Sequence, residues 1–92
     1  MIQITDVKIR LVNTENSKLR AVASIVIDEC FAVHDIKIIE GETGELIAMP
    51  SRKTPTGEFK DITHPINSPT REYMRTVIID AYKRAVVENP EA

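Results

Sequence analysis

The sequence has few of the residues from which redox and metal sites are built. Its 92 residues include one cysteine, two histidines and no tryptophan. The single cysteine, Cys30, excludes an intramolecular disulfide bond, and its place beside Phe31 in an apolar run predicts a buried structural thiol. The histidines, His34 and His64, show no HxH, HExxH or CxxC spacing, so a zinc site lacks ligands. We expect no metal and no cofactor.

Catalytic motifs are also missing. The three glycines are too widely spaced for a phosphate-cradling loop. Ser51, His64 and Asp61 supply the residue types of a catalytic triad, but no nucleophile-elbow pattern surrounds the serine. Any protein of this size offers such a combination, so we expect a protein that is not an enzyme.

Long apolar runs are absent as well. No stretch is long enough to span a membrane, and residues 1–10 alternate apolar and polar side chains, unlike a signal peptide. We therefore expect a cytoplasmic protein with no membrane contact. A chain of this length builds one domain, residues 1–92, around one modest core. Aromatic residues are only 4% of the chain, so aliphatic side chains must fill that core.

Period-two alternation predicts strands over residues 2–63. Residues 2–11 alternate with a break at Thr5 and Asp6, where a bulge shifts the phase. Residues 19–27 alternate again after a polar turn, which predicts an antiparallel hairpin. Strands expected over residues 31–39, 46–49 and 59–63 complete a meander of about five strands, and residues 51–57 are expected to form an exposed loop.

One helix is predicted at the end of the chain, over residues 69–88. Ser68 can cap it, Pro69 suits the first helical position, and Asn89 and Pro90 end it. Its apolar residues recur at steps of three and four, in a stripe formed by Met74, Val77, Ile78, Ala81, Tyr82 and Ala85. Strands followed by one helix indicate an α+β fold, an antiparallel sheet with the C-terminal helix packed on it.

The second predicted strand is apolar on both faces. Val22 and Val26 are out of phase with Ile25 and Ile27, while a single helix covers only one face of a sheet. We therefore predict a homodimer that forms either by pairing of sheet edges or by packing of sheet faces.

Charge is distributed unevenly along the chain. The net charge of −2 argues against a protein that coats nucleic acid by bulk electrostatics. Residues 51–75 nevertheless carry five Lys and Arg against three Asp and Glu, whereas residues 1–50 carry five against eight. The middle of the chain therefore holds a local basic region.

The most unusual stretch of that region is Ser51, Arg52, Lys53 and Thr54, which two prolines bracket. A guanidinium forks onto phosphate, an ammonium adds a point charge, and hydroxyls donate to phosphate oxygens. The prolines reduce the entropy that the segment loses on binding. The segment predicts a phosphate-binding loop, and a solvated loop that keeps the molecule soluble is the alternative interpretation.

A second pair of cations, Arg71 and Arg75, lies one turn apart near the start of the predicted helix. The free amides of a helix N-terminus also favour phosphate. An exposed helix face, partly neutralised by Glu72, is the alternative. Because few aromatic residues are available for base stacking, a single-strand binder that depends on stacking is disfavoured.

Residues 49–55, MPSRKTP, are the centre of a resemblance to a known family. Further motifs follow the same order, VHDI at 33–36, IEG at 39–41, GEFKDI at 57–62 and HPINS at 64–68. On these motifs the chain resembles the stage V sporulation protein G (SpoVG) family from the first strand into the helix. Ile47 stands where that family usually has Phe, and Thr56 where Asp is common.

The resemblance implies a small bacterial regulator tied to sporulation and septation, a dimer that binds DNA or RNA in a site-dependent manner. Family binding is associated with the basic loop and the helix, which correspond here to Ser51, Arg52, Lys53, Thr54, Arg71 and Arg75. The alternative hypothesis is a non-enzymatic interaction module that docks to a protein of the cell-division machinery, with nucleic-acid binding incidental.

Overall fold

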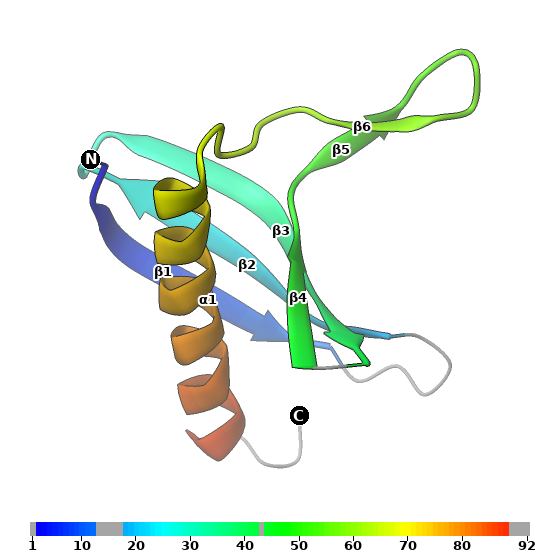
Figure 1. Ribbon diagram of the computed structural model, residues 1–92. Coiled ribbons are helices and arrows are strands. Elements are labelled where there is room, and N and C mark those ends of the chain that lie inside the picture. The colour runs from blue at the N-terminus through cyan, green and yellow to red at the C-terminus, as the bar shows by residue number, and fades with distance from the viewer. Residues whose placement is uncertain (1, 13–17, 43, 89–92) are drawn as a thin grey trace.

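The computed structural model describes residues 2–12, 18–42 and 44–88, which form a sheet with one helix across it and a projecting hairpin (Figure 1). The elements are β1 (Ile4–Leu11), β2 (Leu19–Ile27), β3 (Phe31–Gly41), β4 (Gly44–Ala48), β5 (Ser51–Lys53), β6 (Phe59–Asp61) and α1 (Ser68–Glu88). Strands β1–β4 make one antiparallel sheet in chain order, and β5 pairs with β6 in a second sheet. The predicted α+β fold is confirmed. The turn expected around residues 13–17 and the helix stop at residues 89–90 lie outside the described residues.

The bulge predicted in the first strand is confirmed. The register between β1 and β2 shifts between Ile4 and Asp6. The Thr5 hydroxyl is freed by this shift to donate to the Val26 carbonyl at 3.3 Å and to accept from the Glu29 amide at 3.1 Å. The bulge therefore ties β1 to the turn that joins β2 to β3.

Cys30 lies in that turn and is exposed, so the prediction of a buried thiol is wrong. Asp28 and Glu29 both have positive φ angles, and the Cys30 amide donates to the Ile27 carbonyl at 3.1 Å. This tight reversal places the cysteine in the connection beyond the end of the sheet, just before β3 begins at Phe31. Its apolar neighbours in the sequence belong to β2 and β3, and Cys30 itself lies in neither strand.

The expected fifth strand lies outside the main sheet. Residues Phe59–Asp61 pair with Ser51–Lys53, so the first part of the segment expected to be a loop is a strand. Pro50 separates the two sheets because its ring removes the amide that a continuing strand would use. Its carbonyl instead accepts from the Ile62 amide at 2.7 Å, which starts the hairpin.

The core lies between α1 and the covered face of the four-stranded sheet. β2 contributes the small side chains of Ala21 and Ala23 to this core, together with Ile25. The buried residues are Ala21, Ala23, Ile25, Val33, Ile36, Ile38, Met74, Ile78 and Ile79. Met74 and Ile78 belong to the predicted helical stripe, and Ile79 joins them from beside it. This core fixes how the helix and its basic first turns sit on the sheet.

Two polar contacts hold the N-terminal half of α1 in place. The Asn67 side chain accepts from the Thr70 amide at 2.9 Å, so Asn67 caps the helix, one residue before the predicted Ser68. Both residues suit a cap, and the sequence pattern does not distinguish them. The Tyr73 hydroxyl accepts from the Ile4 amide at 2.9 Å, which fastens the helix to β1.

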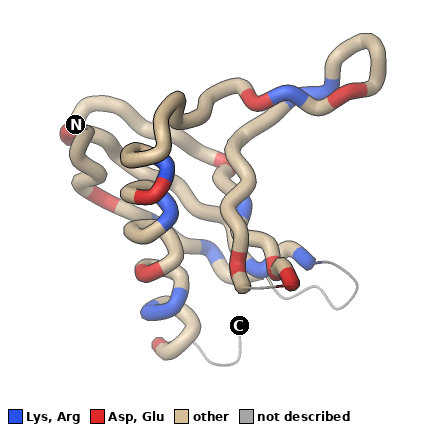
Figure 2. The backbone as a smooth tube through the Cα atoms, in the orientation of Figure 1, with Lys and Arg blue, Asp and Glu red and all other residues tan. Residues whose placement is uncertain are grey.

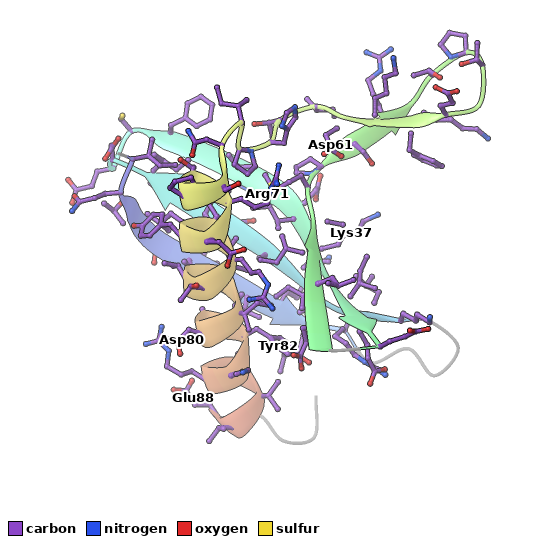
Figure 3. The ribbon with its side chains drawn as sticks, viewed as in Figure 1. Lys37, Asp61, Arg71, Asp80, Tyr82 and Glu88 are labelled. Carbon is purple, nitrogen blue, oxygen red and sulfur yellow. The ribbon has the colours of Figure 1, made fainter. Side chains whose placement is uncertain are left out.

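The other end of α1 carries Tyr82, which points toward the first residues of β4 (Figure 3). Partial burial, and then the carboxylate of Glu45, raise the pKa of the Tyr82 hydroxyl above its ordinary value of 10.0. As pH rises past that value, the unfolded state ionises first, so the protein loses stability until the folded pKa is passed. We expect Tyr82→Phe to remove this loss.

Urea unfolding at about pH 9 and about pH 11 checks this prediction. In the Tyr82→Phe protein, only the other titrating groups can change the unfolding free energy between these two conditions. The wild-type protein should lose more unfolding free energy between the two conditions than the Tyr82→Phe protein. Equal losses would show that the Tyr82 hydroxyl is as free to ionise in the folded state as in the unfolded one.

Candidate nucleic-acid interface

The basic hairpin, residues 50–62, projects from the end of the sheet where β4 stops (Figure 1). Its tip is a tight turn in which the Gly57 amide donates to the Thr54 carbonyl at 3.0 Å and the Thr54 amide to the Glu58 carbonyl at 2.7 Å. Pro55 occupies the second turn position, and Gly57 has a φ of 90°, which suits glycine. The predicted basic segment is therefore a shaped hairpin.

Two cations lie directly opposite one another on one face of this hairpin. The strand register pairs Arg52 with Lys60, and it pairs Lys53 with Phe59 on the other face. Like charges at opposed positions repel, which costs stability unless an anion binds between them. Lys60 and Phe59 were not among the predicted site residues. Their places opposite Arg52 and Lys53 follow only from the register of β5 and β6, which have three residues each.

The cations of the hairpin and of the helix start keep their charges unpaired. Over the described ranges, two ion pairs occur, Arg20 with Glu40, and Arg84 with Asp80 at 3.7 Å. Neither includes a residue of the hairpin or of the first two turns of α1. Figure 2 shows these Lys and Arg positions in blue on the hairpin and on the helix. Their side chains are therefore free to meet an anionic partner.

The two predicted hydroxyl residues have different surroundings. The Thr54 hydroxyl lies 2.9 Å from the Thr56 hydroxyl and accepts from the Glu58 amide at 3.2 Å. Thr54 thus helps to shape the turn. Ser51 is exposed at the base of the hairpin, opposite Asp61.

An open groove of about 490 Å³ lies between the base of the hairpin and α1. Ser51 and Asp61 line it from the hairpin, and Arg71 and Arg75 from the helix. Figure 3 shows Arg71 on the first turns of α1 and Asp61 at the hairpin base. The predicted residues therefore fall into two neighbouring groups. Ser51 and the two arginines share the groove, while Arg52 and Lys53 extend beyond it.

The amides of the helix N-terminus are largely used within the protein. Pro69 has no amide proton, and the amides of Thr70 and Arg71 bond to the side chain and the carbonyl of Asn67. The amides of Thr70 and Arg71 are therefore not free to hold a phosphate. The groups at this end that could meet an anion are side chains, chiefly the guanidinium groups of Arg71 and Arg75.

The histidines make local contacts. His34 Nδ1 lies 3.1 Å from the Ser24 hydroxyl, and His64 Nδ1 lies 3.0 Å from the Pro65 carbonyl oxygen. Within the part of the chain that the structure describes, no three His, Cys, Asp or Glu residues gather where they could hold a metal ion. In the same part, the one helix is not apolar enough to cross a membrane.

Comparison with known proteins identifies the family. The SpoVG family model matches residues 2–84. A relative from Clostridium beijerinckii is 57% identical over 86 residues, covering 94% of this chain and 93% of its own length. A relative from Caldicellulosiruptor bescii is 54% identical over 84 residues, covering 91% and 94%. Both carry the provisional name septation protein SpoVG. The resemblance seen in the sequence motifs is thereby confirmed, and the chain belongs to the SpoVG family.

Proposed function

We propose that this protein is a cytoplasmic, dimeric regulator that binds DNA or RNA at defined sites and acts in bacterial septation and sporulation. The observation that carries the nucleic-acid part is the basic hairpin. Arg52 and Lys60 lie opposite one another on one face, Lys53 lies on the other face, and no described carboxylate pairs with any of the three. The septation part rests on the names of the relatives.

The overall negative charge is compatible with this function because the hairpin and the first turns of α1 carry a local excess of cations, with five Lys and Arg against three Asp and Glu over residues 51–75. The hairpin and the first turns of α1 meet at the groove that Arg71 and Arg75 line. Glu40 and Glu45 pair with each other in register at the far end of the β3–β4 ladder. A polyanion that approaches the hairpin end therefore meets an excess of positive charge.

A homodimer would present two such ends to one nucleic acid. Strands β1 and β4 are the edges of the main sheet, and each has one unpaired side that a second copy can extend. Val22 and Val26 are half-buried on the face that α1 leaves uncovered. Two linked basic hairpins would raise the effective affinity well above that of one, because the second contact is intramolecular.

A salt titration tests the nucleic-acid part of the proposal. We expect the affinity for a labelled duplex, followed by fluorescence anisotropy, to fall steeply between about 50 and 200 mM salt, since each phosphate contact adds about 0.9 to the logarithmic slope. Three or more contacts per protomer should give a slope steeper than about −2.5. A slope near zero would contradict phosphate binding by these cations.

Docking to a cell-division protein is the second candidate function. Phe31 and Ile66 are large apolar side chains with exposed fractions of 61% and 86%, and both line a shallow depression beside the start of α1. Nucleic-acid binding that is absent at all salt concentrations, together with a partner protein lost on Phe31→Ser, would favour this candidate over the first.

A further inference from the structure

The face of the main sheet that α1 leaves uncovered carries a row of cations. The register places Arg10, Val22, Lys37 and Ala48 side by side across the four strands. Arg10 and Lys37 are two strands apart, or roughly 10 Å, because neighbouring strands lie about 4.8 Å apart. Lys8 precedes Arg10 by two residues and so shares its face. Figure 3 shows Lys37 on the side of the sheet away from the helix.

The basic hairpin and this row together line an open cleft of about 540 Å³. Arg10 and Lys37 line the cleft from the sheet, and Phe59 and Ile62 line it from the hairpin. The Phe59 side chain is 73% exposed although it is one of only four aromatic residues in the chain. The fold thus holds an exposed aromatic ring in the same cleft as two cations.

Positive charge exceeds negative charge along this cleft. Asp35, at a positive φ on the irregular stretch of β3, is the carboxylate residue among those that line it. In the residues that the structure covers, no ion pair involves Lys8, Arg10 or Lys37. A smaller depression of about 380 Å³ shares Arg10 and Asp35 with the cleft and continues it to Lys8. The face therefore offers three cations along one continuous path.

An aromatic ring beside a path of cations suits an unpaired nucleotide. Every base has a face that can stack on a ring, and cations track the phosphates of a single strand. The volume lies within the range of about 300–1,000 Å³ that is usual for small-molecule sites, so a base can enter. The bases of a duplex are already stacked on one another and do not offer their faces to Phe59.

We propose that this cleft binds an unpaired segment of nucleic acid, with one base stacked on Phe59 and the adjoining phosphates held by Lys37 and Arg10. The inference rests on the proposed function and extends it to a second surface, which gives the protein a preference for single-stranded segments. The low aromatic content predicted the opposite. One ring is enough when the hairpin holds it opposite the cations.

The test compares Phe59→Leu, which keeps apolar bulk without an aromatic face, with Phe59→Tyr, which keeps the ring. The ligands are a labelled oligonucleotide of about 12 unpaired nucleotides, within the site sizes of single-strand binders, and the duplex of the same sequence. We expect Phe59→Leu to weaken single-strand binding on the order of tenfold and duplex binding less than about twofold. Phe59→Tyr should bind both ligands as the wild type does.

Lys37→Ala should weaken binding of the single strand more than binding of the duplex, and Lys83→Ala, which removes the same charge from the exposed part of α1, should affect both equally. Equal binding of the single strand by Phe59→Leu and wild type would overturn the inference. So would a change of oligomeric state in Phe59→Leu, measured by sedimentation, because the cleft would then hold a second copy. Absence of binding to either ligand by the wild type would instead overturn the proposed function.

Discussion

Replacing Arg52 and Lys53 together by alanine is expected to weaken binding of every nucleic-acid sequence by about tenfold or more at 0.1 M salt. Both side chains are exposed on the basic hairpin, and both act through phosphate, which all sequences share. The loss should therefore be uniform across ligands. The fold should be unchanged, because neither side chain contributes to the buried core. Anisotropy titrations against several DNA and RNA sequences measure the effect.

The matched control is the pair Lys18→Ala and Lys83→Ala, which removes the same charge from other surfaces. Lys18 is exposed just before β2, at the opposite end of the sheet from the hairpin, and Lys83 is exposed on α1. We expect this control to change affinity by less than about threefold, through net charge alone. If both double variants lose affinity equally, the hairpin has no special part in binding.

Ile78→Ala should lower the free energy of unfolding by about 3 kcal/mol, the usual cost of cutting a buried Ile to Ala. The Ile78 side chain is fully buried, with an exposed fraction of 0%, at the centre of the contact between α1 and the sheet. Domains of this size are typically stable by about 5–15 kcal/mol, so the loss is a large share of the total. Chemical denaturation monitored by circular dichroism measures it.

Val87→Ala on the same helix is the control for this substitution. The Val87 side chain is 79% exposed, so its truncation should change stability by less than about 0.5 kcal/mol. Similar losses at both positions would mean that α1 is not held on the sheet by the stripe around Ile78. The packing of α1 around Ile78 would then not be what holds Arg71 and Arg75 in position.

The long elements of this fold were predictable because their patterns repeat many times. β2 alternates over nine residues, and α1 keeps its apolar stripe over about three turns. Even the bulge at Thr5 could be found, since a break in strict alternation has few other causes. These elements each bury one face, and burial of one face produces a regular spacing of apolar residues in the sequence.

The hairpin was not predictable in the same way because burial does not form it. Its strands have three residues each, all exposed, and backbone hydrogen bonds from Ile62 to Pro50 and from Thr54 to Glu58 hold it. No apolar alternation marks it. The pairing of Arg52 with Lys60 and the place of Phe59 in the cleft follow only from its register, so both were missed.

The sequence supplies the residue types of the candidate site but not their arrangement in space. Cations between prolines indicated phosphate, and Arg52, Lys53, Arg71 and Arg75 are all exposed. Their division between a projecting hairpin and a groove depends on where Pro50 turns the chain out of the sheet. The direction in which the chain leaves the sheet at Pro50 cannot be read from a single sequence, because packing around β4 sets that direction.

The most direct test is to map the bound surface by nuclear magnetic resonance. Isotope-labelled protein titrated with an oligonucleotide should show its largest amide shifts in residues 51–61 and around Arg71 and Arg75. Amides at the opposite end of the sheet, near Glu40 and Glu45, should stay unchanged. Shifts that leave the hairpin unaffected and gather elsewhere would contradict a nucleic-acid interface built on Arg52, Lys53 and Lys60.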